Sequence, residues 1–339
     1  MIFGWLLSGV YAASWLLTLV LRRYALSKSL MDIPNERSSH AVPTPRGGGV
    51  AIVVSFAFAV PVLANIGLLN SDDLYGLLGS GSIVAVIGFA DDHGHIAARW
   101  RLLGHFGAAL WALFWLNGLP PISIFDSTLD MAWLGYVFGA VYLVWMLNLY
   151  NFMDGIDGLA SAEALSACLG MCLVYGVSGN TELIFAPLLL AAAVAGFICW
   201  NFPSARIFMG DAGSGFLGIM LAFMSLADTW NNPDLIWCWL ILLGVFVMDA
   251  TWTLGSRFLR GEKIYEAHRC HAYQHAARVH ASHKAVTLGA VALNVFWLLP
   301  IALAVATGLL VGIVGLAIAY FPLMMLCWYY KGGYTPSGD

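Results

Sequence analysis

Long runs of apolar residues, separated by short polar segments, dominate this sequence and constrain its fold most strongly. A run of about 20 apolar residues can cross a bilayer as a helix, and a helix satisfies its own backbone polar groups there. Of the 339 residues, 60% are apolar and only 10% are charged, whereas soluble domains contain about 25% charged residues. The sequence therefore predicts an all-α integral membrane protein, with residues 1–339 forming a single polytopic domain.

Eleven of the apolar runs qualify as transmembrane helices. Some contain Gly or Pro, which membrane helices tolerate. The first run is predicted to be a retained helix rather than a signal peptide, because Arg22 and Arg23 follow its apolar core instead of preceding it. The predicted spans are 2–21, 48–69, 74–90, 103–118, 132–150, 158–177, 183–200, 213–229, 234–253, 286–306 and 309–329.

The distribution of basic residues predicts the orientation of the chain. With a periplasmic N-terminus, all 15 Lys and Arg residues fall in the inner segments and none in the outer loops. Lys and Arg concentrate on the cytoplasmic side of membrane proteins. The nine His residues lie in or beside the same segments, and the net charge of −4 gives no indication of nucleic-acid binding. The predicted cytoplasmic segments are 22–47, 91–102, 151–157, 201–212, 254–285 and the C-terminal tail.

Five carboxylates from three of these segments are predicted to gather at the cytoplasmic face. Solvated loop charge is the ordinary explanation for single acids. Several of these acids, however, lie at the ends of spans, where a charge is costly and usually functional. The five are Asp91, Asp92, Asp154, Asp157 and Asp211.

The segment 32–49 reads DIPNERSSHAVPTPRGGG. Its prolines favour extended backbone, and its glycines allow close approach of another part of the chain. His40 and Arg46 could then contact phosphate. The alternative is a basic loop beside the membrane that is attracted to anionic lipid.

The third span closes as GFADDHGHIAARWR, residues 88–101. The adjacent carboxylates Asp91 and Asp92 suit a divalent metal, or a base whose pKa is raised by its neighbour. The His and Arg residues that follow the pair would attract an anionic substrate. An Asp pair alone is a weak signal.

Residues 148–159, NLYNFMDGIDGL, form a more specific pattern. Asn151, Asp154 and Asp157 have i, i+3, i+6 spacing, so on a helix or helical turn they share roughly one face. Gly155 and Gly158 allow a nucleotide or another backbone to come near. Helix N-terminal capping would explain one of the polar residues but not all three.

Residues 201–218, NFPSARIFMGDAGSGFLG, place Asp211 in a Gly-rich turn that leads into a span. The backbone N–H groups at such a helix N-terminus favour phosphate. A carboxylate there would repel phosphate, so a bridging Mg²⁺ explains the combination. Phe208 could stack on a base.

The loop 254–285 contains HRCHAYQHAARVHASH. His268, His271 and His275 have i, i+3, i+7 spacing, so a helix would present them as a stripe, and such a stripe can bind zinc. The Arg and Lys residues of the loop favour phosphate contact instead, and the chain has no H-E-x-x-H motif.

In order, these segments resemble the polyprenyl-phosphate N-acetylhexosamine-1-phosphate transferase family. The resemblance covers nearly the whole chain and rests on P-T-P-R-G-G-G, the D-D pair, N-F-x-D-G-x-D-G-L, F-x-G-D-x-G-S and the histidine-bearing last loop. It implies about ten or eleven transmembrane helices and a cytoplasmic active site in the bacterial inner membrane. It also implies transfer of a sugar-1-phosphate from a UDP-sugar to undecaprenyl phosphate, with release of UMP. The expected cofactor is Mg²⁺, with Mn²⁺ as an alternative.

The resemblance also implies roles for residues at matching positions. Asp211 would be the main Mg²⁺ ligand, supported by Asn151. Asp91 and Asp92 would be the catalytic pair, one of them activating the lipid phosphate. We expect direct in-line attack at the β-phosphorus, while a covalent phospho-aspartate route stays open. The expected remaining contacts are nucleotide binding by Asp154 and Asp157, stacking by Phe208, phosphate contact by His40 and Arg46, and diphosphate binding by His268, His271 and His275, with His271 also expected to be a catalytic residue.

Departures from the family pattern favour one branch. Many relatives carry an acid or a lysine where this chain has His95, Ala97 and Ala98, and the peptidoglycan branch has a lysine near His40. The chain therefore looks closer to the branch that initiates O-antigen or lipopolysaccharide synthesis, with GlcNAc, FucNAc or QuiNAc as the sugar.

Three alternatives remain open. The first is a phospho-N-acetylmuramoyl-pentapeptide transferase of peptidoglycan synthesis. The second is a secondary transporter, although such proteins place polar residues near the midplane and often contain repeats, whereas here Asp249 is the main ionisable residue in a span. The third is an inactive, scaffold-like relative. A homodimer formed through the spans is also plausible.

Overall fold

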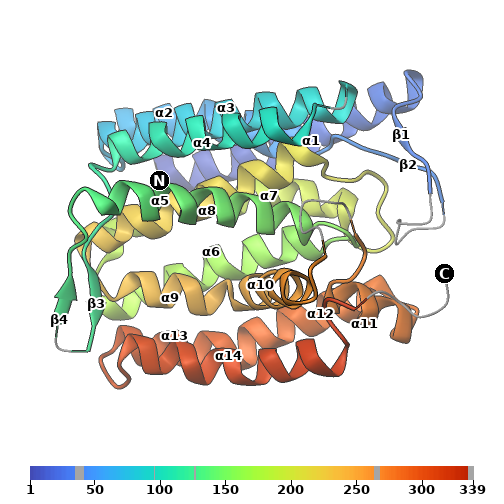
Figure 1. The fold of residues 1–339 in the computed structure, drawn as a ribbon. Coiled ribbons are helices and arrows are strands. Elements are labelled where there is room, and N and C mark those ends of the chain that lie inside the picture. Colours follow the sequence, from blue (N-terminus) through green and yellow to red (C-terminus); the bar gives the residue numbers. More distant parts are fainter. Residues whose placement is uncertain (35–41, 95, 126, 263–267, 335–339) are drawn as a thin grey trace.

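The computed structural model describes residues 1–34, 42–94, 96–125, 127–262 and 268–334. The described chain is a bundle of long α-helices with two short hairpins (Figure 1). The helices are α1 (Ile2–Ser27), α2 (Val50–Asn65), α3 (Ser71–Gly94), α4 (Ala98–Trp115), α5 (Leu134–Phe152), α6 (Leu159–Ser178), α7 (Phe185–Asn201), α8 (Asp211–Asn231), α9 (Leu235–Leu242), α10 (Gly244–Leu259), α11 (Ala272–His280), α12 (His283–Leu293), α13 (Leu299–Ala306) and α14 (Gly312–Tyr329), with a 3₁₀ turn η1 (Thr181–Ile184) and a π-helical segment η2 (Asn294–Leu298).

Each of the eleven predicted spans coincides largely with one helix or with two or three consecutive helical segments. Within the described residues, eight helical segments are long and apolar enough to cross a membrane, and the bent pair α9–α10 makes a ninth. Two predicted spans fall short of that standard: α2 has only 16 residues, and α4 carries Arg99 and Arg101 in its first turn. The chain is therefore an all-α integral membrane protein, while the count of eleven spans and their orientation remain predictions.

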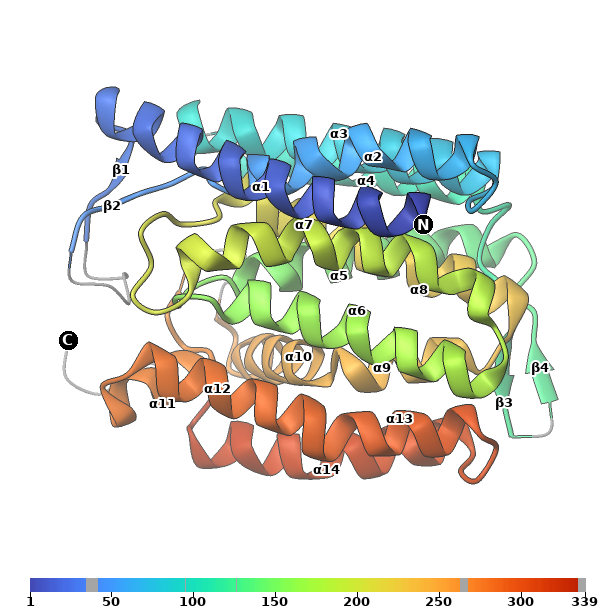
Figure 2. The same ribbon diagram turned by 180° about the vertical axis from the view of Figure 1, so that it is seen from behind.

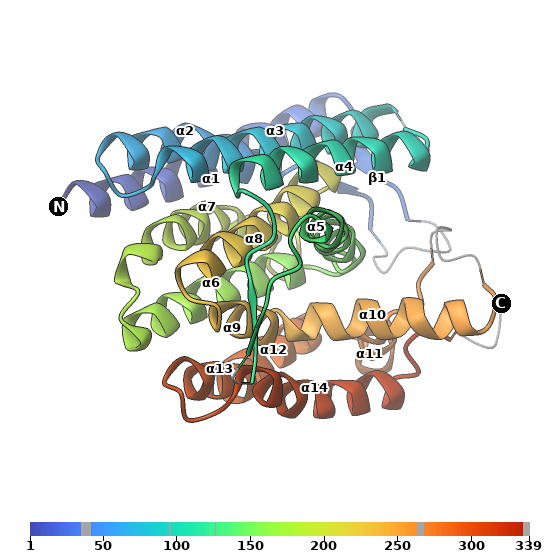
Figure 3. The same ribbon diagram turned by 60° about the vertical axis from the view of Figure 1, so that its left-hand side comes forward.

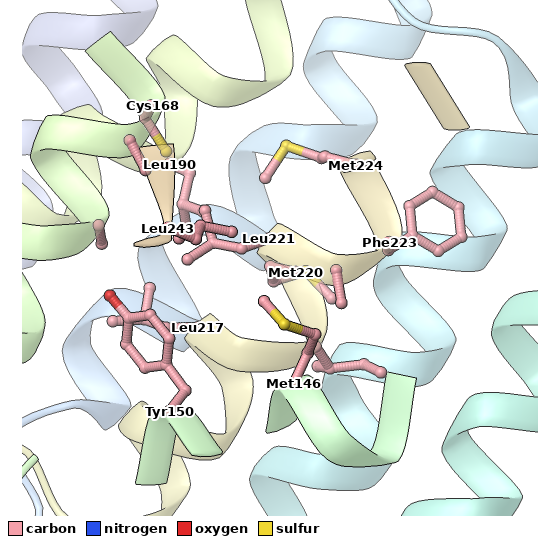
Figure 4. Close-up of a cluster of buried hydrophobic side chains, with 14 of the residues drawn as sticks. Met146, Tyr150, Cys168, Leu190, Leu217, Met220, Leu221, Phe223, Met224 and Leu243 are labelled. Atoms are coloured by element: carbon pink, nitrogen blue, oxygen red, sulfur yellow. The ribbon is translucent and has the colours of Figure 1, made fainter. Parts of the chain in front are cut away.

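The helix α8 forms the centre of the bundle, between α3 and α5. Its candidate span is 94% buried, whereas the next most buried candidate span is 61% buried. Figure 4 shows Leu217, Met220 and Leu221 of α8 packed among side chains from α5, α6 and α7. Close approach of α5 requires Gly218, because a Cβ atom there would lie 2.7 Å from the Cα atom of Leu147. The first residue of this central helix is Asp211.

The N-terminal and C-terminal helices cover opposite sides of this core (Figure 2). The helix α1 packs against α7 and α2, and α14 packs against α10 and α9. The side chains that point away from the core, among them Trp5, Phe114 and Phe321, are large, apolar and exposed. Such side chains suit contact with lipid tails.

Two of the predicted spans are interrupted. The pair α9–α10 bends by 72°, so that α10 is seen end-on in Figure 1 while the surrounding helices run across the view; Figure 3 shows α10 from the side. The bend packs closely against α14, since a Cβ atom on Gly244 would lie 3.0 Å from the Tyr320 ring. The second interruption is η2, one π-helical turn between α12 and α13.

The two hairpins lie at opposite ends of the bundle (Figure 1). At one end β1 (Met31–Asp32) pairs with β2 (Thr44–Pro45), and at the other β3 (Ile122–Ile124) pairs with β4 (Ser127–Leu129). The extended backbone predicted for the proline-containing segment is confirmed at residues 44–45. The site described next lies at the β1–β2 end.

Candidate active site

Four helix ends meet beside the β1–β2 hairpin. The last turn of α3 carries Asp91 and Asp92, and the first residue of α8 is Asp211. The start of α4 contributes Arg101, and the end of α5 contributes Asn151. Residues separated by up to 120 positions in the sequence are thus brought into contact, as the sequence pattern predicted for the acids.

Asp92 caps the N-terminus of α8. Its Oδ1 accepts a hydrogen bond from the backbone N–H of Asp211 at 3.2 Å, and its Oδ2 accepts one from Ala212 at 3.4 Å. These are two of the N–H groups that a helix leaves unpaired at its start. A buried carboxylate therefore occupies the N–H groups of Asp211 and Ala212. Phosphate binding at this terminus, which was predicted for the N–H groups of Gly210, Gly213 and Gly215, stays a prediction.

Two glycines make this arrangement possible. A Cβ atom on Gly88 of α3 would lie 2.5 Å from the backbone N of Ala212, so only glycine lets the two helices come this close. Gly210 has a φ of 78°, and a Cβ atom there would lie 2.7 Å from Oδ2 of Asp92. The absence of a side chain at Gly88 and Gly210 therefore lets the Asp92 carboxylate approach the backbone at the start of α8.

Arg101 lies between the other two carboxylates. Its guanidinium forms an ion pair with Asp91 and lies 3.3 Å from Oδ2 of Asp211. Oδ1 of Asp91 also accepts a hydrogen bond from the backbone N–H of Ile96 at 2.7 Å. The sequence indicated only that Arg101 would attract an anionic substrate. Its position between Asp91 and Asp211 was not predicted, because Asp211 is 110 residues away in the sequence.

The segment that follows β2 lies against this cluster. Arg46 donates a hydrogen bond to the backbone carbonyl of Asp92. The N–H groups of Gly48 and Gly49 each donate at 2.9 Å, to the carbonyls of Phe208 and Met209 respectively. The close backbone approach predicted for these glycines is confirmed. Arg46 and Phe208, both predicted substrate contacts, thus lie beside the acids, whereas His40 and His95 are outside the described residues.

The NLYNFMDGIDGL motif spans the end of α5 and the turn into α6. Asn151 accepts a hydrogen bond from the hydroxyl of Ser214 at 3.1 Å and so joins α5 to α8. The helix ends at Phe152, so Asp154 and Asp157 lie in the turn, and the three polar residues do not share one helix face. The group that approaches Gly155 is a side chain, since a Cβ atom there would lie 2.2 Å from the Tyr273 hydroxyl. The backbone approach predicted for this motif is confirmed at Gly158, where a Cβ atom would lie 3.3 Å from the Cα atom of Phe202.

Asp157 ties this turn to two other segments. Its Oδ2 accepts a hydrogen bond from the backbone N–H of Ala205 at 2.9 Å, and its Oδ1 lies 3.2 Å from Nδ1 of His283. Asn201 supports the same turn, because its Oδ1 accepts from the N–H of Gly158 at 3.1 Å. His283 was not among the predicted site residues.

Asp154 lies among the other acids of the site. Burial raises its pKa well above the ordinary value. The negative charges of Asp211, Asp92 and Asp157 raise it further. The site thus gathers more negative charge than its basic side chains compensate, a condition that a bound cation would relieve.

The donor set is compatible with Mg²⁺. Carboxylate and amide oxygens are the ligands this ion prefers, and it is usually held by one or two carboxylates together with substrate phosphates and water. Among the described residues, no three His, Cys, Asp or Glu side chains form a preassembled metal cage. Asp211 and Asn151 could therefore supply only part of a coordination shell.

His271 is held in place by Asp249 of α10. Nδ1 of His271 lies 3.3 Å from Oδ1 of Asp249, and the backbone N–H groups of Ala272 and Tyr273 donate to the same carboxylate at 2.9 and 2.8 Å. Asp249 therefore caps α11, which begins only after His271. An acid inside an apolar run was the one sequence signal for Asp249, since such acids are usually functional.

The predicted histidine stripe is wrong, because His268 and His271 precede α11 and only His275 lies on it. The His268 and His271 rings stack with centroids 5.0 Å apart. Burial lowers the pKa of His268 to about 3, and the positive charges of His271 and Arg257 add to the shift, so this ring is neutral at pH 7. Nε2 of His275 donates to the carbonyl of Tyr334 at 3.0 Å, toward the C-terminus.

A basic cavity of about 580 Å³ opens beside Asp157. Most of its lining comes from the loop after α7 and from α11 and the start of α12. Its charge suits an anionic ligand. The charged and polar lining residues are Asp157, Ser204, Arg269, Gln274, Arg278, Ser282, His283 and Lys284.

Replacing Asp249 by Ala should lower the stability of the protein. The substitution removes the acceptor for two N–H groups at the start of α11, and loss of a helix cap costs about 0.5–2 kcal/mol. Thermal unfolding in detergent measures the effect, with Asp234→Ala as the control, because Asp234 precedes α9 without forming a side-chain cap. Equal unfolding temperatures for the two variants would contradict the capping role.

The bundle and its site define a polytopic membrane protein with a charged site where several helix ends meet. A sequence model described as "Glycosyl transferase family 4" matches residues 74–228. This range contains Asp91, Asp92, Asn151, Asp154 and Asp211.

Curated relatives cover most of the chain. A "Probable undecaprenyl-phosphate N-acetylglucosaminyl 1-phosphate transferase" of Bacillus subtilis is 28% identical over 276 residues, which are 79% of this chain and 75% of the relative. A "Decaprenyl-phosphate N-acetylglucosaminephosphotransferase" of Mycobacterium tuberculosis is 28% identical over 291 residues, 75% of this chain and 70% of the relative. A "Phospho-N-acetylmuramoyl-pentapeptide-transferase" of Streptococcus pneumoniae is 30% identical over 237 residues, 65% and 68% respectively.

The chain therefore belongs to glycosyl transferase family 4, the polyprenyl-phosphate hexosamine-1-phosphate transferases. It is a membrane-bound transferase, as the sequence motifs predicted.

Proposed function

We propose that the protein transfers an N-acetylhexosamine-1-phosphate from a UDP-sugar to undecaprenyl phosphate and releases UMP. The observation that carries this proposal is the convergence of Asp91, Asp92 and Asp211 at one site of a polytopic membrane protein. The names of the curated relatives support the same reaction class. The proposed location is the cytoplasmic face of the bacterial inner membrane.

Phosphoryl transfer requires alignment and charge neutralisation more than covalent chemistry by the protein. We propose that Asp211 and Asn151 hold Mg²⁺. When bound, this ion supplies neutralisation of the charge that develops on the phosphoryl oxygens. Arg46 and Arg101, at the edge of the acid cluster, contribute positive charge toward the phosphates of donor and acceptor.

The hydrogen bonds of Asp92 favour direct attack by the lipid phosphate. Both of its carboxylate oxygens accept backbone N–H groups, and the residue is only 7% exposed. A nucleophile must reach the phosphorus atom with a free oxygen, so Asp92 is proposed to position α8 rather than to form a phospho-enzyme. Asp91, whose contacts come from Arg101 and Ile96, is the better candidate to orient the acceptor.

The donor is proposed to be UDP-GlcNAc or a related UDP-N-acetylhexosamine, and the product to initiate O-antigen, lipopolysaccharide or another envelope glycan. The basic cavity beside Asp157 is the proposed place for the anionic part of this donor, with Phe208 as a stacking partner for uracil. His268 and His271 are the proposed diphosphate contacts. Nε2 of His275 donates to the carbonyl of Tyr334, so Nδ1 is the ring nitrogen left to contact substrate while that bond is intact.

A transfer assay tests the proposed function. Purified protein in detergent is mixed with undecaprenyl phosphate, Mg²⁺ and a panel of radiolabelled UDP-N-acetylhexosamines, with EDTA as the control. We expect label from one donor to enter the lipid fraction and EDTA to stop the transfer.

Two other outcomes would change the assignment. Transfer only from UDP-N-acetylmuramoyl-pentapeptide would place the chain with its peptidoglycan-synthesising relatives. If folded protein transferred label from none of the donors, the proposal would be refuted, and a transporter or a scaffold-like relative would become the better explanation.

A further inference from the structure

A carboxyl group and an amide face each other inside the bundle, away from the acids already described. Glu163 lies one turn into α6 and is 1% exposed; Asn294 begins η2 and is 2% exposed. Nδ2 of Asn294 donates to Oε2 of Glu163 at 2.6 Å. After this bond, Oε1 of Glu163 and Oδ1 of Asn294 are both buried without a hydrogen-bond partner.

The two unpaired atoms belong to the same pair, and both are acceptors. A carboxylate and an amide carbonyl cannot bond to each other, but a protonated carboxyl group gains one O–H donor. If the proton is on Oε1, this O–H donates a hydrogen bond to Oδ1 of Asn294. The two side chains then form a ring of two reciprocal hydrogen bonds. Buried polar atoms are nearly always paired, so one proton accounts for both exceptions.

We propose that Glu163 is a protonated carboxylic acid that forms two reciprocal hydrogen bonds with Asn294, and that this pair positions α10 for the transfer reaction. The positioning role rests on the proposed function; the protonation does not. An ionised carboxylate without a counter-charge is costly in such surroundings.

No basic side chain among the described residues offsets a negative charge on Glu163, since no Lys, Arg or His side chain there is paired with this carboxyl group. The nearby titratable groups are Tyr150 and Tyr320. Their hydroxyls donate to backbone carbonyls, Tyr150 to Ala160 at 2.6 Å and Tyr320 to Leu240 at 2.7 Å.

The pair lies beside the first turn of α10, the helix that carries Asp249. The backbone N–H of Phe246 faces the Glu163 carboxyl group, and Phe246 is in the first turn of α10, just after the 72° bend. Asp249 follows three residues later and holds His271 and the start of α11. Through this contact with Phe246, the pair is proposed to position the beginning of the helix that carries Asp249 and to act on the site through that helix.

Infrared spectroscopy tests the protonation without reference to activity. Protein labelled with ¹³C-carboxyl glutamate is compared as wild type, Glu163→Gln and Asn294→Leu. We expect a carboxylic-acid C=O band in the wild type that is absent from Glu163→Gln and shifted to higher frequency in Asn294→Leu. A wild-type spectrum that matches Glu163→Gln in this region would overturn the proposal, even in a protein that shows no transferase activity.

Transfer kinetics test the positioning. Gln at position 163 can donate an N–H to Oδ1 of Asn294 and accept from its Nδ2, so Glu163→Gln should retain transfer activity within about twofold. Leu can form neither bond. Glu163→Leu should therefore lose about tenfold or more in activity, because displaced site residues can cost about 10²-fold. Glu182→Leu, an exposed glutamate at the other end of the bundle, is the control. Equal losses of activity in the Gln and Leu variants would refute positioning by the pair. If Glu163→Leu does not fold, a loss of more than about twofold in Glu163→Gln refutes it.

Discussion

Replacing Asp211 by Asn is expected to reduce transfer about 100-fold or more while leaving the helical fold intact, since removing one preorganised electrostatic contact commonly costs about 10²–10³ in rate. Asn keeps the size and hydrogen-bonding capacity of the side chain. It removes the negative charge from the residue proposed as the main Mg²⁺ ligand and from the 3.3 Å contact with Arg101. Turnover at saturating Mg²⁺ is the measurement, with circular dichroism and thermal unfolding in detergent as the checks on folding.

The matched control is Asp72→Asn. Asp72 is exposed in the first turn of α3, at the opposite end of the helix that carries Asp91 and Asp92. Its substitution changes net charge by the same amount and should leave turnover unchanged. Near-normal activity of Asp211→Asn at saturating Mg²⁺ would refute the metal assignment, whatever the control shows.

Replacing Gly88 by Ala should damage the site from a distance. The added Cβ atom would meet the backbone of α8 at 2.5 Å from the N atom of Ala212, and backbone cannot rotate out of the way as a side chain can. Overpacking of this kind costs about 1–3 kcal/mol. The start of α8 would move away from Asp92, so we expect a lower unfolding temperature and about tenfold or greater loss of transfer, given the cost of small misplacements.

Gly107→Ala is the comparison for this variant. Gly107 lies in the neighbouring helix α4, and a Cβ atom there would meet nothing within 4 Å. Its substitution should leave both stability and transfer unchanged. If Gly88→Ala behaved in the same way, the close contact between α3 and α8 would not be what holds the acid cluster together.

Much of the fold could be predicted because long apolar runs have few other solutions. The bend between α9 and α10 could not. The run 235–248 is continuously apolar and has no proline, and the close packing of Gly244 against Tyr320 in α14 joins residues far apart in the sequence. The membrane helices were thus predictable from local composition, and their interruptions were not.

The same limit applies to the site. The acids could be predicted because their spacing and their position at span ends are local features. The capping of α8 by Asp92 joins residues more than 100 positions apart, and no local pattern reveals it. The histidine stripe failed for the same reason, because Asp249, 22 positions before His271, determines where α11 begins.

The reaction centre and the basic cavity are built from different parts of the chain. The acids lie at the ends of packed membrane helices, whereas most of the cavity lining comes from the loop after α7 and from α11 and the start of α12. On the proposed function, exchange of segments 203–206 and 268–284 between relatives would alter which donor is accepted and leave the helix ends in place. The chemistry of transfer would then stay constant while the donor sugar changes.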